Sequence, residues 1–142
     1  MLARRPAFVL PLLLAAGLLS ACGGSAAEDA SSKVCAARDD IAQHVDKLKD
    51  LTLTTATTDQ VNASLDAIKQ DLKTIRTSRG KLSDERRKDV QAANSEFRTA
   101  ISNTVATVGK SVSADAAASD AKQALQQLAT TYKTSFGKLD CS

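Results

Sequence analysis

The most regular pattern in the sequence is a run of five apolar residues whose spacing alternates between four and three positions. The run consists of Val61, Leu65, Ile68, Leu72 and Ile75. This spacing aligns the five side chains along one stripe of an α-helix and leaves polar residues on the opposite face. The one strand-like stretch, residues 51–58, has no second strand to pair with. The pattern therefore predicts an all-α fold in which such stripes face one another.

Three other segments, at about residues 32–51, 84–108 and 113–136, carry stripes with the same helical spacing. Together with the segment at about residues 57–79 they predict four helices within one domain. The residues expected to face inward in these three segments are Val34, Ile41, Val45 and Leu48, then Val90, Phe97, Ile101, Val105 and Val108 with Ala93 and Ala100, and then Ala121, Ala124, Leu125, Leu128, Tyr132 and Phe136.

Residues that favour helix ends separate the four segments. The expected N-caps are Ser31 or Ser32, Thr57 in a capping box with Gln60, Ser83 and Ser113. The expected stops are Gly80, Gly109 and Gly137, with Gly80 in the left-handed conformation that glycine tolerates. The ends therefore divide the chain at the same places as the stripes.

Two arrangements of these segments are open. In an up-down four-helix bundle, each helix packs against two neighbours. If the stripe continues through Gly80, a single helix from Asp59 to Val108 would be about 75 Å long, flanked by two shorter helices. The bundle buries more apolar surface, so we expect the four-helix bundle.

Residues 1–21 have the three parts of a secretory signal. Arg4 and Arg5 are positive, residues 7–19 are apolar, and Ser20 and Ala21 are small. A membrane-spanning helix needs about 20 residues, and Pro11 interrupts this shorter run. We therefore expect a leader that is cleaved on export.

The end of this leader, Leu19-Ser20-Ala21-Cys22, resembles the lipobox of bacterial lipoproteins. The resemblance implies a diacylglyceryl group on the Cys22 sulfur and a new N-terminus there, often acylated too, for example with palmitate. The alternative is an ordinary secretory cut beside an incidental cysteine. Two or more acyl chains hold a protein stably on a membrane. Under this reading, residues 22–32 form a flexible tether of about 17 Å, and residues 33–142 form a bundle on the extracytoplasmic face of the cell membrane.

The lipid on Cys22 would leave Cys35 and Cys141 as an even pair. In an oxidising compartment such a pair usually forms a disulfide. The pair encloses a loop of about 100 residues, whose closure is worth up to about 4.7 kcal/mol in the chain-entropy model. We therefore expect one disulfide that joins the two ends of the domain.

The composition argues against nucleic acid as a partner. The formal net charge is +3, and the leader contributes two of these charges through Arg4 and Arg5. A nucleic-acid-binding surface needs a strongly basic face. The aromatic residues after the leader are Phe97, Tyr132 and Phe136, which do not suit a platform for stacked bases.

The sequence also lacks the residue patterns of common active sites and metal sites. A nucleophilic triad needs a base beside a nucleophile, and a zinc site needs closely spaced ligands. His44 is the only histidine, and we expect its own turn or Asp40 to satisfy the ring. We therefore expect no enzymatic activity, no metal and no cofactor.

A cluster of basic residues surrounds the expected turn at Gly80. It comprises Arg76, Arg79, Lys81, Arg86, Arg87 and Lys88, opposed only by Asp84 and Glu85. The cluster is either a solvated hairpin tip or a contact with anionic lipid headgroups or acidic wall polymer, worth about 1 kcal/mol per basic residue near an anionic surface. In an up-down bundle this tip lies at the end where the tether enters, so it would face the membrane.

These features predict a lipid-anchored, non-enzymatic protein of the cell envelope that presents a helical surface to a protein or another envelope component. The alternative is a carrier that holds an apolar ligand between its helices. The alanine-rich first half of the fourth helix argues against a roomy cavity, because small residues permit close packing. A cavity above roughly 300 Å³ would favour the carrier.

Overall fold

The computed structural model describes residues 25–51, 58–111 and 115–141. Four α-helices follow one another: α1 (Ala26–Asp50), α2 (Thr58–Ser78), α3 (Asp84–Ser111) and α4 (Asp115–Phe136). A short 3-10 helix, η2 (Arg79–Lys81), lies between α2 and α3. The described residues include no strand. The predicted all-α fold is therefore confirmed.

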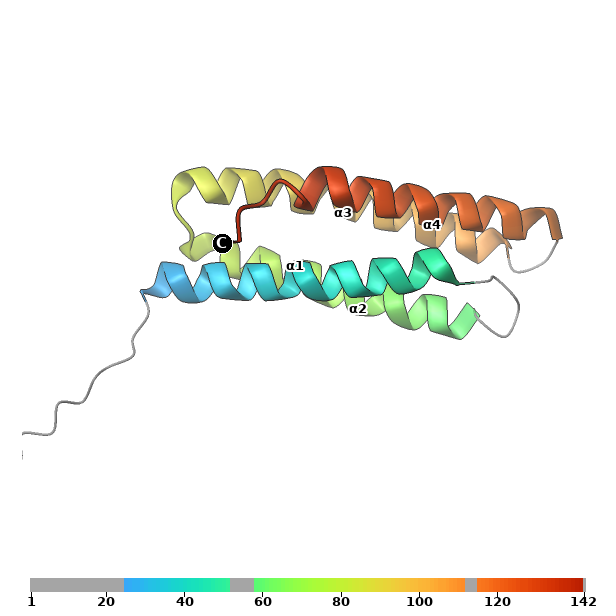
Figure 1. Ribbon diagram of the computed structural model, residues 1–142, viewed down its shortest axis with the longest axis horizontal. Helices are drawn as coiled ribbons and strands as arrows, with labels where there is room; N and C mark the ends of the chain where they lie inside the picture. The colour runs from blue at the N-terminus through green and yellow to red at the C-terminus, as the bar shows by residue number, and fades with distance from the viewer. Residues whose placement is uncertain (1–24, 52–57, 112–114, 142) are drawn as a thin grey trace, which may run out of the picture.

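The four helices lie side by side, and each runs opposite to the one before it (Figure 1). The hairpin of α1 and α2 packs against the hairpin of α3 and α4, through contacts of α1 with α4 and of α2 with α3. The start of α1 and the turn between α2 and α3 lie at the same end of the bundle (Figure 1). This arrangement is the expected up-down bundle.

The chain reverses between α2 and α3, so the single long helix considered above does not form. After η2, Leu82 adopts an extended conformation (φ −76°, ψ 161°), and its side chain is buried. No described glycine has a positive φ, so the expected left-handed stop at Gly80 is wrong. A 3-10 turn followed by extended Leu82 makes the reversal, and burial of Leu82 stabilises it.

Helix α1 begins earlier than expected. Ser25 and Glu28 form a capping box: the Ser25 hydroxyl accepts a hydrogen bond from the Glu28 N–H (3.2 Å), and the Glu28 carboxylate accepts one from the Ser25 N–H (2.6 Å). The predicted N-cap at Ser31 or Ser32 is therefore wrong. Residues 26–32 belong to α1 and not to a flexible tether, because this capping box satisfies the first amides of the helix. Cys22 lies outside the described residues.

Two other expected glycine stops have different outcomes. Helix α3 continues through Gly109 to Ser111, so that stop is wrong. Helix α4 ends at Phe136 as expected. A Cβ at Gly137 would lie 2.3 Å from the Lys133 carbonyl oxygen, so glycine is needed there for a close backbone approach. The expected caps Thr57 and Ser113 lie outside the described residues.

The predicted stripes of α1 and α2 are buried throughout, and those of α3 and α4 nearly so. Ala100, Val105 and Tyr132 are only partly buried and pack against the core, and Ala124 is also only partly buried. The core also includes three alanines that the stripes omitted, namely Ala30, Ala37 and Ala129. Small side chains at these positions let neighbouring helices approach closely.

An aromatic cluster joins α3 to α4. The ring of Phe97 lies edge-on to those of Tyr132 and Phe136, with centroids 5.7 Å and 5.6 Å away. The Tyr132 hydroxyl donates a hydrogen bond to the Arg38 carbonyl oxygen of α1 at 2.9 Å. The cluster therefore connects three helices through one packed centre.

The C-terminal tail returns to the body of the bundle. Cys35 of α1 and Cys141 form the predicted disulfide, with Cα atoms 5.7 Å apart. The Arg38 guanidinium donates to the Leu139 carbonyl oxygen at 3.0 Å, and Arg86 of α3 donates to the Asp140 carbonyl oxygen. The tail is thus attached to both α1 and α3.

Candidate functional site

The six residues of the predicted basic cluster have different surroundings in the structure. Arg86 is occupied by the C-terminal tail, and Arg87 forms an ion pair with Asp84. Lys81, in η2, and Lys88, near the start of α3, are exposed. The turn between α2 and α3 lies at the end of the bundle that carries the start of α1 (Figure 1). Arg76 and Arg79 instead line a hollow between α2 and α3.

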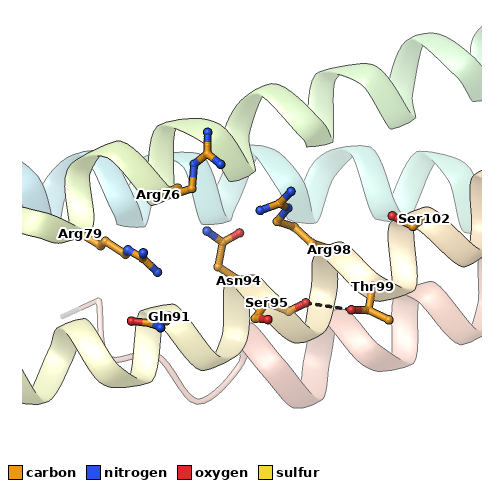
Figure 2. A pocket seen from close by; sticks show the side chains of 8 residues that line it. All are labelled: Arg76, Arg79, Gln91, Asn94, Ser95, Arg98, Thr99 and Ser102. Carbon is orange, nitrogen blue, oxygen red and sulfur yellow. Dashed lines mark hydrogen bonds between the residues drawn. The ribbon is translucent and has the colours of Figure 1, made fainter.

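This hollow, which we call the α2–α3 groove, has a volume of about 400 Å³ and is open to solvent (Figure 2). Arg76 comes from α2 and Arg79 from the adjoining η2. Every other lining residue comes from α3: Gln91, Asn94, Ser95, Arg98, Thr99 and Ser102. The groove is therefore built by the polar faces of two antiparallel segments that meet beside the core.

A second hollow of about 320 Å³ adjoins the groove and shares Arg76, Arg98 and Ser102 with it. It adds two more cations, Lys69 and Lys73, above an apolar floor. Among the described residues, no aspartate or glutamate lines either hollow. The side of the bundle between α2 and α3 is thus positively charged over about three helical turns of each segment.

The three arginines of the groove have no partner within the part of the chain that the structure describes. Arg76, Arg79 and Arg98 form no ion pair or hydrogen bond with any described residue. Nearby cations do find acceptors: Lys69 pairs with Asp66 at 2.9 Å, and Arg87 pairs with Asp84. The chain therefore supplies acceptors outside the groove but not inside it.

Asn94 forms a polar floor under these arginines. Its side chain is 3% exposed, and its Nδ2 donates to the Leu72 carbonyl oxygen of α2 at 3.3 Å. The Asn94 Oδ1 is buried and has no hydrogen-bond partner. Buried polar atoms without a partner are uncommon in native proteins and costly.

Arg98 and Asn94 were missed in the sequence because the basic cluster was defined by proximity along the chain. Helical spacing would have found Arg98, since Gln91, Asn94, Arg98 and Ser102 are three or four positions apart and share one polar face of α3. The burial of Asn94 depends on the Leu72 carbonyl of α2 and has no signal within α3 itself.

The histidine does not have the partner that we expected. His44 is partly buried, and its Nδ1 has no hydrogen-bond partner among the described residues, so the expected pairing is wrong for this atom. Asp71 of α2 lies in the same region, where its partial burial, and secondarily the Asp40 carboxylate, raise its pKa, while His44 opposes the shift. Among the described residues, no group of three or more histidine, cysteine, aspartate or glutamate side chains is placed to hold a metal ion.

A third hollow of about 300 Å³ lies between α3 and α4 and is lined mainly by polar side chains, among them Glu96, Asn103 and Gln127. An apolar carrier would need a largely apolar enclosure, whereas the hollows described here have polar or cationic rims. None of the described helices combines the length and the apolar character that crossing a bilayer requires.

No protein-family model, curated protein or solved structure matches this chain. The leader and the geometry of the bundle are therefore the observations that bear on function.

Proposed function

We propose that this protein is a lipid-anchored, non-enzymatic binding domain on the extracytoplasmic face of the cell membrane, where its helical surface contacts another component of the envelope. The proposal combines the lipobox-like residues that end at Cys22 with one observation on the bundle. That observation is the early start of α1: the capping residue Ser25 is only three positions after Cys22.

This short separation has a consequence for orientation. The start of α1 and the α2–α3 turn lie at the same end of the bundle (Figure 1). An acylated Cys22 would hold that end beside the bilayer, with exposed Lys81 and Lys88 near the anionic headgroups. The opposite end and the sides of the bundle would remain available to a partner.

The surroundings of His44 in the described part of the chain support a binding role. The buried Nδ1 of this histidine has no hydrogen-bond partner among the described residues, whereas a general base contacts the group that it activates. The described titratable groups also offer no metal cluster.

The test begins with the anchor. The full chain is expressed in a bacterial host that processes lipoproteins, together with Cys22→Ala as the matched control. We expect the intact mass of the wild-type product to carry a diacylglyceryl group, and the protein to enter the detergent phase on Triton X-114 partition. The variant is expected in the aqueous phase. A free thiol at Cys22 in the mature wild-type protein would overturn the proposal.

The contact with the envelope needs a separate measurement. Crosslinking in intact cells, followed by mapping of the crosslinked peptides, is expected to give crosslinks on exposed faces of the bundle in the wild type. The same crosslinks should be lost in Cys22→Ala. Equal crosslinks in both proteins would show that anchoring does not bring the domain to its partner.

A further inference from the structure

We propose that the α2–α3 groove binds a phosphate ester of a polyol, with Arg76, Arg79 and Arg98 holding the phosphate and Asn94 accepting a hydrogen bond from a hydroxyl of the same ligand. The inference goes beyond the proposed function, because it names a ligand chemistry and does not need the lipid anchor. The groove is fully assembled by described residues.

The α2–α3 groove is positively charged. Arg76, Arg79 and Arg98 line the same hollow. Figure 2 shows Arg98 coming from α3 and Arg76 and Arg79 from the opposite segment. No carboxylate among the described residues lines the hollow. Like charges that share a groove repel one another, and a bound anion relieves that repulsion.

The three arginines of the groove favour phosphate over carboxylate as the bound anion. Guanidinium groups are planar donors that bind carboxylate and phosphate through paired hydrogen bonds. A carboxylate has two oxygens, whereas a phosphate ester presents more acceptor oxygens in a tetrahedral array. Three arginines that approach from two segments therefore suit phosphate better than carboxylate.

Asn94 needs a hydrogen-bond donor from the ligand, whereas the three arginines need an acceptor. Its Oδ1 only accepts hydrogen bonds, and in the structure this buried atom has no donor. Its Nδ2 is already held by the Leu72 carbonyl oxygen, which fixes the amide in this orientation. A hydroxyl of the ligand that displaced the side chains covering this atom would supply the missing donor, and a fully ionised phosphate would not.

The remaining lining agrees with a hydroxylated ligand. Gln91, Ser95 and Ser102 carry polar groups on the α3 side of the groove, where the Thr99 hydroxyl donates to the Ser95 carbonyl oxygen at 3.2 Å. The volume of about 400 Å³ falls in the range of small-molecule sites. It exceeds what inorganic phosphate alone would fill, and leaves room for the polyol.

The same chemistry occurs in a soluble polyol phosphate and in the headgroup of an anionic lipid. The experiment separates these sources with two probes: glycerol 3-phosphate in solution, and vesicles of phosphatidylglycerol with phosphatidylcholine vesicles as the neutral control. The protein is residues 22–142 with Cys22→Ala, so that neither the apolar leader nor acyl chains contribute. Binding of either probe supports the proposal and identifies the source, and binding of neither probe at 0.15 M salt overturns it.

Matched variants test the assignment of residues. Arg98→Gln removes a charge inside the groove, and Lys88→Gln removes the same charge from an exposed position outside it. We expect Arg98→Gln to weaken binding of the supporting probe about tenfold or more, because charge-assisted hydrogen bonds are the strong ones, and Lys88→Gln to change it less than twofold. Equal weakening by the two variants would mean attraction to net charge only, and would overturn the site.

Asn94 has its own test. Inorganic phosphate is expected to bind about tenfold more weakly than glycerol 3-phosphate, or than phosphatidylglycerol where the vesicle is the probe that binds. Asn94→Asp keeps the size of the side chain but places a carboxylate beside the arginines, and should weaken binding further than Lys88→Gln. Circular dichroism checks that the variant stays helical. Equal affinity for inorganic phosphate and for the ester would refute the hydroxyl contact. Because the intact mass of the wild-type product reports the lipid separately, failure of the groove and failure of the anchor remain distinguishable.

Discussion

Removal of the Cys35–Cys141 disulfide should destabilise the bundle mainly because it increases the conformational entropy of the unfolded chain. The bond joins residues 106 positions apart. In the chain-entropy model, a closed loop of this length lowers the stability of the unfolded state by about 4.7 kcal/mol at 25 °C. Residual structure in the unfolded chain reduces that figure, so we take it as the upper limit.

The folded state itself should change little. Without the disulfide, the tail is still held by Arg38 on the Leu139 carbonyl oxygen and by Arg86 on the Asp140 carbonyl oxygen. Net contributions of hydrogen bonds are about 1 kcal/mol each, and somewhat more for charged donors. These contacts keep the tail on the native bundle. The loss of stability therefore comes largely from a lower free energy of the unfolded state.

The assay is urea denaturation followed by helical circular dichroism. The variant Cys35→Ser/Cys141→Ser is compared with the disulfide-bonded protein, both in a Cys22→Ala background. We expect the free energy of unfolding to fall by about 2–5 kcal/mol, and the denaturant dependence to rise as the freed chain exposes more surface. Helical content in the absence of urea should be unchanged. A loss below about 1 kcal/mol, or a marked loss of native helicity, would refute the reasoning.

Three further predictions concern the core, two glycines and one carboxylate. Phe97→Ala should lower the free energy of unfolding by about 3–5 kcal/mol, and Phe97→Leu by clearly less, because this ring is fully buried between two other rings. Urea denaturation measures both losses, and equal losses would contradict the packing. Gly137→Ala should lower the melting temperature, because its Cβ would meet the Lys133 carbonyl oxygen. Gly80→Ala should leave the free energy of unfolding unchanged or raise it by up to about 1 kcal/mol, because a Cβ there meets nothing within 4 Å and Gly80 has no positive φ. A more stable Gly137→Ala than Gly80→Ala would contradict these roles. Burial, and secondarily the Asp40 carboxylate, raise the pKa of Asp71 above its ordinary value of 3.8. The folded state therefore binds this proton more tightly than the unfolded state, and the free energy of unfolding falls as pH rises from 3.8 through the raised pKa. Asp71→Asn should therefore be more stable than the wild type at pH 7 and lose this advantage toward pH 3, as shown by melting curves across pH; an advantage that grows on acidification would show the opposite shift.

Apolar spacing predicted the helical core well, because the position of a side chain around a helix follows directly from its sequence number. The α2 stripe from Val61 to Ile75 is buried at all five predicted positions. The start of α1 was predicted six residues too late. Small polar residues before Ser32 suggested a tether, yet alanine is a strong helix former, and Ser25 with Glu28 has the spacing of a capping box.

The glycines were harder to predict because their roles depend on the neighbouring helices. At Gly80 the decisive residue is Leu82, whose burial accompanies contacts of η2 with α1. Gly109 has no neighbour within 4 Å of a Cβ position, and the helix simply continues through it. Local sequence does not distinguish these two cases.

Only part of the candidate site could be predicted. Counting charges around Gly80 found Arg76 and Arg79 but grouped them with Arg86, which holds the tail. Arg98 lies beside them only because α3 folds back along α2. Proximity across a helix pair requires the tertiary fold, and so does the unpaired Asn94 Oδ1.

The early capping box at Ser25 would limit how far the bundle could stand from an acylated Cys22. Three peptide units span at most about 11 Å when fully extended, in place of the longer reach of an eleven-residue tether. In an acylated protein the start of α1 would therefore stay within about 11 Å of Cys22, a distance comparable to the Debye length of about 10 Å at 0.1 M salt. Any partner would have to come to the membrane to meet it.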